Sequence, residues 1–351
     1  MKTKLPDIGK ISPEVFEELI YPRLGAKRKS VIVPPQNGVD VGIVEIGDQA
    51  VAMTTDPVFI VPEYGFERAA WFAIHILASD VVTSGLPPTY LSIDLNLPMS
   101  MTEDQLEIVW QTMHKECEKL GIAVVCGHTA RYENCGYPMV GGATVLAVGS
   151  KDQYVTPKLA RAGDHIIITK GPAIEASGIF ATMFPDRLKK EFGQPFSDQA
   201  QNLFYQMSVV EDATTAVSVG VRDNGVTAMH DATECGIWGG VYELVQAANL
   251  GVRLYKDDIV VEDGVFDICR FFGIQDPFAA ISEGTLIISC RPHQSESIVS
   301  ALKSKGIPAS IAGELTGSAD GMVAIENGKE QPFQHPGVDP FWNAFYQALN
   351  E

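Results

Sequence analysis

The chain has 351 residues, with 26 lysine and arginine residues against 44 aspartate and glutamate residues, a formal net charge of −18. Hydrophobic residues make up 46% of it, which is enough for a sizeable core and excludes wholesale disorder. The negative charge repels nucleic acid and anionic lipid, so we expect neither nucleic acid nor a membrane as a partner. An anionic substrate would need a local source of positive charge, such as a metal ion or a helix N-terminus.

Residues 1–10 are polar and lysine-rich and contain no apolar segment, so we predict that they are not a signal peptide. The apolar stretches elsewhere are too short to span a bilayer. Six cysteines occur without a C-x-x-C pair, which favours reduced thiols over a disulfide framework. These features together predict a cytoplasmic protein.

The first half of the chain predicts alternating strands and helices. Residues 43–55 alternate imperfectly between apolar and polar positions and predict strand structure, with a turn at Gly47 and Asp48. Residues 67–83 place their apolar side chains on one stripe and predict a helix.

Thr102 begins the clearest predicted helix. Thr102 and Gln105 have the spacing of a capping box, and Gly121 is a typical helix end. Two buried strands are predicted to follow, at residues 122–126 and 139–148.

A polar, basic stretch at residues 151–163 predicts a boundary between two domains, residues 1–155 and 156–351. Strands and helices in both halves predict an α/β or α+β fold. The elements predicted in the second half are strands at 165–169, 226–229, 285–290 and 309–313, and helices at 199–219, 239–248 and 294–305.

Four aspartates are candidates for a shared metal site. Asp40, Asp56 and Asp231 stand beside predicted strands, and Asp80 lies in a helix whose other face is apolar. Mg²⁺ prefers several carboxylate oxygens together with phosphate oxygens of a substrate, and carboxylates at strand ends can converge in this way. The alternative is that each aspartate forms a turn or caps a helix.

A second candidate site is built from softer ligands. Cys126 and His128 end one predicted strand, while His230 and Cys235 follow another, and the four side chains could hold Zn²⁺ or Fe. Their spacing matches no known zinc finger, and the alternative is that the cysteines are ordinary core residues. The sequence also contains no Walker A, G-x-G-x-x-G, H-E-x-x-H or G-x-S-x-G motif.

Several short motifs follow one another in a characteristic order: Thr-Thr-Asp-Pro at 54–57, Ala-Ser-Asp at 78–80, Cys-Gly-His-Thr at 126–129, His-Asp-Ala-Thr at 230–233 and Ser-Glu-Gly at 282–284. In order and spacing they resemble the aminoimidazole ribonucleotide synthetase (PurM-like) superfamily, over about residues 9–342. Within that superfamily the chain looks most like the HypE branch of hydrogenase maturation proteins.

The resemblance implies a two-domain fold in which the sheet of the N-terminal domain pairs with that of a second subunit, forming a barrel-like homodimer. A C-terminal α/β domain packs beside it, and ATP lies between the domains with its phosphates held through Mg²⁺. Carried over by motif, the implied Mg²⁺ ligands are Asp40, Asp56 and Asp80. The implied ATP-binding residues are these three with Thr129, Thr233 and Glu283, and the implied catalytic residues are Asp80, Asp231 and His128.

HypE proteins use ATP to dehydrate a carboxamide carried on their own C-terminal cysteine. This chain departs from the family pattern in three ways. His128 stands where the family has a carboxylate, Glu234 and Cys235 replace an Arg-Gly pair, and the last cysteine is Cys290. We therefore expect a substrate other than a tail cysteine.

The resemblance thus predicts an ATP-dependent enzyme that activates a carbonyl or amide oxygen by phosphorylation, in hydrogenase or metallocentre maturation. Its acceptor would be an unidentified small molecule or a protein-borne group. The alternative is a paralogue that has lost catalysis and acts as a nucleotide- or metal-binding regulatory protein.

Overall fold

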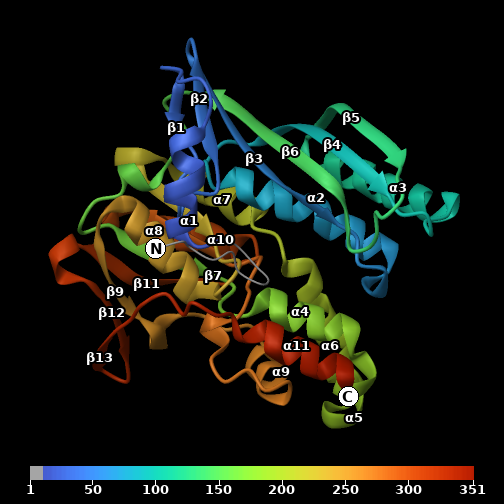
Figure 1. Ribbon diagram of the computed structural model, residues 1–351. Coiled ribbons are helices and arrows are strands. Elements are labelled where there is room, and N and C mark those ends of the chain that lie inside the picture. Colours follow the sequence, from blue (N-terminus) through green and yellow to red (C-terminus); the bar gives the residue numbers. More distant parts are fainter. Residues whose placement is uncertain (1–10) are drawn as a thin grey trace.

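The computed structural model describes residues 11–351, which form two mixed α/β domains, each built on one sheet (Figure 1). The predicted two-domain fold class is therefore confirmed. The prediction that residues 1–10 are not a signal peptide lies outside the described residues. Among the residues described, none of the helices is both long enough and apolar enough to cross a membrane.

The first sheet has six strands in the order β1–β2–β3–β6–β4–β5, antiparallel except for the parallel pair β4–β5. Helices α2 and α3 lie along one face of this sheet (Figure 1). The elements of this part of the chain are α1 (Pro13–Val15), β1 (Val31–Val33), β2 (Gly42–Ile46), β3 (Gln49–Phe59), α2 (Phe66–Val82), β4 (Pro88–Leu97), α3 (Glu103–Leu120), β5 (Ala123–Arg131) and β6 (Met139–Ser150).

The predicted capping box at the start of α3 is confirmed. Thr102 Oγ1 accepts a hydrogen bond of 3.2 Å from the Gln105 N–H, and Gln105 Oε1 accepts one of 3.0 Å from the Thr102 N–H. Gly121 ends the helix in the left-handed conformation, as predicted. The turn predicted at Gly47 and Asp48 joins β2 to β3 as a hairpin.

Strand β5 is present, but the prediction that it is buried was wrong. Every residue of β5 is exposed or half-exposed, with Val124 at 44% and Val125 at 56%. The strand lies at the edge of the sheet, where only β4 pairs with it. An apolar run predicts burial but does not indicate which surface provides it, and the contacts within one chain leave this strand largely exposed.

The second sheet has seven strands in the order β13–β12–β9–β11–β7–β10–β8, antiparallel except for the parallel pair β12–β9. Its strands are β7 (His165–Thr169), β8 (Val226–Asp231), β9 (Gly251–Tyr255), β10 (Leu286–Cys290), β11 (Ala309–Thr316), β12 (Met322–Glu326) and β13 (Lys329–Pro332). Its helices are α4 (Ile174–Met183), α5 (Pro185–Phe192), α6 (Gln194–Ala200), α7 (Val210–Val219), α8 (Gly236–Ala248), α9 (Val265–Phe271), α10 (Pro292–Ser304) and α11 (Pro340–Asn350).

The single helix predicted at residues 199–219 was wrong, because the chain breaks between the 3₁₀ helix η5 (Gln201–Gln206) and α7. At the break, the carbonyl oxygen of Ser208 accepts a 2.7 Å hydrogen bond from Lys170 Nζ, and its hydroxyl pairs with His75 Nδ1 at 2.8 Å. Helical periodicity continues through the break, so the sequence pattern does not reveal it.

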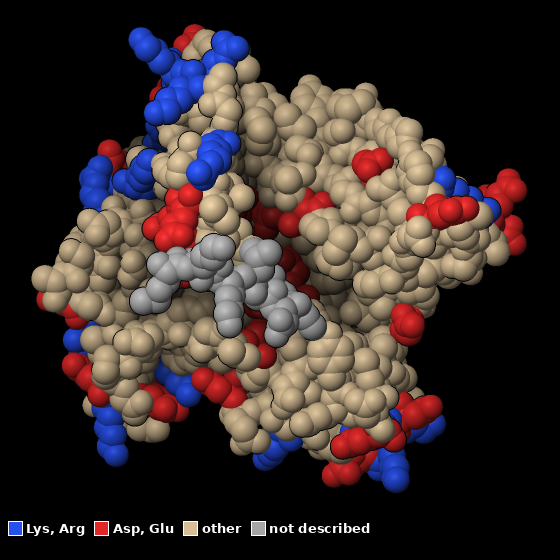
Figure 2. All heavy atoms as spheres, viewed as in Figure 1, with Lys and Arg blue, Asp and Glu red and all other residues tan. Residues whose placement is uncertain are grey.

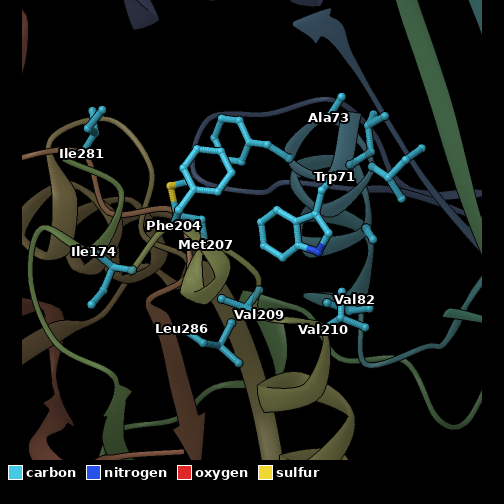
Figure 3. Close-up of a cluster of buried hydrophobic side chains, with 14 of the residues drawn as sticks. Trp71, Ala73, Val82, Ile174, Phe204, Met207, Val209, Val210, Ile281 and Leu286 are labelled. Carbon is cyan, nitrogen blue, oxygen red and sulfur yellow. The ribbon is translucent and has the colours of Figure 1, made fainter. Parts of the chain in front are cut away.

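One apolar core joins the two domains near this break. Trp71 from α2 lies beside Phe204 and Met207 of the second domain (Figure 3), and the Trp71 and Phe204 ring centroids are 6.0 Å apart. The hydroxyl of Ser79, also on α2, accepts a 3.0 Å hydrogen bond from the Val209 N–H. These contacts fix the end of α2, and with it Asp80, against the second domain.

Candidate functional site

Four predicted aspartates meet where the two domains face each other. Asp56 lies on β3, Asp80 in the last turn of α2, and Asp40 just before β2, while Asp231 is the last residue of β8. Side-chain oxygens of Asp40 and Asp231 lie within 4.8 Å of each other, and the charges of Asp40, Asp56 and Asp231 act on Asp80. Figure 2 shows aspartate and glutamate side chains gathered in the hollow between the two parts of the molecule.

The Asp80 carboxyl is affected by the charges of the other three aspartates. Its Oδ2 accepts a 2.8 Å hydrogen bond from Thr54 Oγ1 on β3. Burial, followed by the charges of Asp231, Asp56 and Asp40, raises the pKa of Asp80 well above its ordinary value. A cation placed among these carboxylates would relieve the repulsion that this shift reports.

Asp231 provides the strongest indication that the site holds a ligand. Its side chain is 1% exposed, and neither carboxylate oxygen has a hydrogen-bond partner in the described structure. The nearest cation is His230, whose Nδ1 lies 3.9 Å from Asp231 Oδ1. A buried carboxylate without hydrogen bonds is costly, so such groups are usually paired or coordinate a metal. The donor set is therefore suited to Mg²⁺, which prefers carboxylate oxygens.

His230 contributes a positive charge to the acidic site. Its Nδ1 lies 2.7 Å from the Asp231 carbonyl oxygen, and its Nε2 lies 3.0 Å from Glu243 Oε2 and 3.5 Å from Asp40 Oδ1. Burial lowers the pKa of His230, but Asp40, Glu243 and Asp231 outweigh burial and raise it to about 10. Since both ring nitrogens then donate protons, His230 carries a positive charge among these carboxylates.

Further acidic residues of the second domain lie beside Asp231. Glu175 stands in the first turn of α4, Glu283 precedes β10, and Asp339 caps α11. Burial, despite a hydrogen bond from the Glu283 N–H, raises the pKa of Glu175 to about 7, with contributions from Asp339, Asp231 and Glu234. Sequence reasoning identified Glu283 but missed Glu175 and Asp339, because acids at helix N-termini are common without any function.

The structure places the other predicted site residues in two locations. Thr233 lies in the turn after β8, two residues beyond Asp231, and its carbonyl oxygen accepts a 3.3 Å hydrogen bond from the Ser282 N–H. His128 and Thr129 lie exposed on β5, at the far edge of the first sheet from β3, and His128 Nε2 pairs with Tyr132 Oη at 2.9 Å. Within one chain they are therefore separate from the aspartates.

The predicted Zn²⁺ or Fe site is not assembled within the chain. Cys126 and His128 are exposed on β5, whereas His230 is buried on β8 and Cys235 is buried in the turn after it. Among residues 11–351, one group of three or more potential ligands is compact enough to share a metal ion, and it consists of Asp40, His230 and Asp231. The two halves of the predicted soft-ligand site belong to different sheets.

The chain belongs to the AIR synthase related protein family. The family's N-terminal domain matches residues 38–161, and its C-terminal domain matches residues 161–326. The chain is 21% identical over 326 residues to a putative hydrogenase expression/formation protein of Methanocaldococcus jannaschii, covering 90% of each chain. It is 25% identical over 268 residues to carbamoyl dehydratase HypE of Escherichia coli strain K12, covering 75% of each chain.

Solved structures show the same fold. The chain resembles a chain of a HypE–HypF complex with a TM-score of 0.72 and 18% identity, over 92% of this chain and 99% of that one. It resembles a HypE structure determined in complex with ATP with a TM-score of 0.63 and 20% identity, over 93% of this chain and 96% of that one. The predicted similarity to HypE within the PurM-like superfamily is thus confirmed.

Proposed function

We propose that this protein is an ATP-dependent enzyme that binds Mg²⁺–ATP between its two domains and activates a carbonyl or amide oxygen by phosphorylation. The single observation that carries the proposal is the buried Asp231 carboxylate, which has no hydrogen-bond partner and whose charge acts on Asp80 of the other domain. Its support from relatives is the HypE fold, one of whose structures contains ATP, and the similarity to a carbamoyl dehydratase.

In this proposal, Asp40, Asp56, Asp80 and Asp231 would hold Mg²⁺, which supplies charge neutralisation for the phosphates. The protein positions the acceptor oxygen in line with the γ-phosphate and excludes water. The acceptor oxygen forms a bond to phosphorus while the bond to the ADP oxygen breaks. The former carbonyl oxygen then leaves as part of phosphate, which makes dehydration of an amide possible.

Calorimetry with Mg²⁺ and a non-hydrolysable ATP analogue tests this proposal. We expect the wild-type protein to bind, and Asp80→Asn and Asp231→Asn to weaken binding by about a hundredfold or more, since each removes a carboxylate from the cation. Asp48→Asn is the matched control, because the Asp48 side chain is 93% exposed in the β2–β3 turn and should leave affinity unchanged. Absence of binding to the wild type in large ligand excess would contradict the proposal.

A second candidate function is a nucleotide-binding regulatory protein without turnover. It is favoured by the position of His128 and Thr129, which the family resemblance assigns to the ATP site but which lie on the exposed strand β5. Release of phosphate from ATP by the wild type, lost in Asp56→Asn, would decide against this candidate.

We also propose that the protein is a homodimer that pairs through its first sheet. The support is the exposed apolar surface of β5 and its neighbour β4, which includes Val124, Val125 and Tyr90. A second copy placed against this sheet would bury these side chains. It would also place His128 and Thr129 at a subunit boundary.

A further inference from the structure

Asp40 lies in a loop of the first domain that rests directly on helix α8 of the second domain. The loop, residues 34–41, joins β1 to β2. Gly38 in this loop has a φ of +72°, and a Cβ atom there would lie 2.3 Å from the Glu243 carbonyl oxygen of α8. Glycine allows this close approach without a shift of the backbone. The position of Asp40 is therefore set by contact with the second domain as well as by its own sheet.

His230 connects Asp40 to Glu243 through one ring nitrogen. Its Nε2 lies 3.0 Å from Glu243 Oε2 and 3.5 Å from Asp40 Oδ1, while its Nδ1 lies 2.7 Å from the carbonyl oxygen of Asp231. The ring is buried, and turning it would break the contacts of both nitrogens at once. The shorter contact assigns the Nε2–H hydrogen bond to Glu243, and Asp40 is the more distant of the two carboxylates.

Glu243 lies beside the proposed cation site without belonging to it. Among residues 11–351, the group that is compact enough to share a metal ion does not include Glu243. On its other side, Glu243 Oε1 lies 4.0 Å from His335 Nε2, and the His335 ring meets the Tyr242 ring with centroids 5.4 Å apart. The Glu243 carboxylate is thus located between a buried histidine, His230, and a partly exposed one, His335.

This arrangement makes two positively charged partners compete for Asp40. A Mg²⁺ ion in the proposed site uses the carboxylate oxygens of Asp40, and the His230 Nε2–H can pair with the same carboxylate. While Glu243 accepts the Nε2–H, His230 does not compete with the ion. Without Glu243, Asp40 would be the carboxylate left in contact with this N–H, and a cation would have to displace it.

We therefore infer that Glu243 is a positioning residue of the cation site: it accepts the His230 N–H and so keeps His230 from competing with the cation for Asp40. The effect on nucleotide binding rests on the proposed function, because that function makes Asp40 a Mg²⁺ ligand. The hydrogen bond between Glu243 and His230 can be measured without any nucleotide.

Calorimetry with Mg²⁺ and a non-hydrolysable ATP analogue measures the effect on affinity. We expect Glu243→Ala to weaken binding by about tenfold, and Glu243→Gln to retain most of the affinity, because the glutamine Oε1 still accepts the N–H. The matched control is Gln246→Ala, at an exposed position of the same helix, which should bind like the wild type.

A double-mutant cycle separates positioning from a general structural role. If Glu243 acts through Asp40, Glu243→Ala should cause less than about a twofold further loss in a protein that already carries Asp40→Asn. An equal loss in both backgrounds would overturn the inference, as would unchanged binding in Glu243→Ala.

Nitrogen-15 NMR of the histidine side chains measures the hydrogen bond itself. With the His230 signal assigned by its absence in His230→Gln, we expect its Nε2 resonance to shift in Glu243→Ala and to stay unchanged in Gln246→Ala. An unchanged His230 resonance in Glu243→Ala would overturn the inference. If the resonance shifts as expected but the wild type does not bind the ATP analogue, the contact between Glu243 and His230 stands and the proposed function fails.

Discussion

His75 is a buried, titratable residue of the first domain that contacts the second domain. It stacks on Trp71 with ring centroids 4.1 Å apart, and its Nε2 lies 3.1 Å from Glu116 Oε2 while its Nδ1 contacts the Ser208 hydroxyl. Burial lowers the pKa of His75, although hydrogen bonding to Glu116 opposes this shift. The folded protein therefore holds this ring neutral, with Nε2–H donating to Glu116 and Nδ1 accepting from Ser208.

This depressed pKa predicts a loss of stability in acid. Below pH ~6.5 the unfolded chain takes up a proton at His75, whereas the folded chain resists protonation there. The stability that this residue contributes is therefore complete above that pH and is lost as the pH decreases. We expect His75→Gln to flatten the dependence of the free energy of unfolding on pH between about 7.5 and 5.5. Urea unfolding at the two pH values measures this effect.

His114→Gln is the control for this experiment, because His114 is exposed on α3 and should leave the pH dependence unchanged. The same pH dependence in His75→Gln as in the wild type would show that another group is responsible.

The residues of the site were only partly predictable from the sequence. Asp40, Asp56, Asp80 and Asp231 were identified because each sits in a short motif beside a predicted strand or in a predicted helix. The side-chain contacts of His230 were not predictable, because Asp40 and Glu243 are separated from it in the sequence. Long-range electrostatic pairs leave no local pattern.

Among the single elements, helix α3 allows the clearest measurement of how much a helix cap contributes to the free energy of unfolding. Its capping box satisfies N–H groups that have no partner inside the helix. We expect Thr102→Ala to lower the free energy of unfolding by about 1 kcal/mol. Chemical denaturation measures the difference.

The matched substitution is Thr112→Ala, in the middle of the same helix, where the hydroxyl bonds only to the Ile108 carbonyl. Alanine has the higher helix propensity, so this change should be neutral or stabilising. Equal losses in the two variants would mean that the capping box does not contribute.

The helices and strands differ in how well the sequence predicts them. Long periodic helices such as α2 and α3 were predicted to within a few residues, since their apolar stripes and caps are local signals. The break at Ser208 and the exposure of β5 were not, because both depend on surfaces contributed by other parts of the molecule. A helix break that is stabilised by Lys170 and His75 is visible only when the domains are together.

For the whole molecule, the exposed face of the first sheet predicts its oligomeric state. Val125 is 56% exposed on the edge strand β5, and an exposed apolar edge strand favours association. We expect the wild type to sediment as a dimer and Val125→Lys to sediment as a monomer, with the thermal unfolding of the monomer still cooperative.

Val338→Lys is the control for sedimentation, because Val338 is 80% exposed in the loop before α11, in the second domain. A wild-type protein that sediments as a monomer at micromolar concentration would contradict the proposed pairing. A dimer unaffected by Val125→Lys would place the interface elsewhere.

We propose above that Asp231 of the second domain and Asp40, Asp56 and Asp80 of the first hold one nucleotide-bound cation between them. A crystal structure with Mg²⁺ and a non-hydrolysable ATP analogue tests this most directly. We expect Mg²⁺ in contact with these carboxylates and the phosphates in the hollow between the domains. Nucleotide bound at another place, with the Asp231 carboxylate still without a ligand, would contradict the proposal.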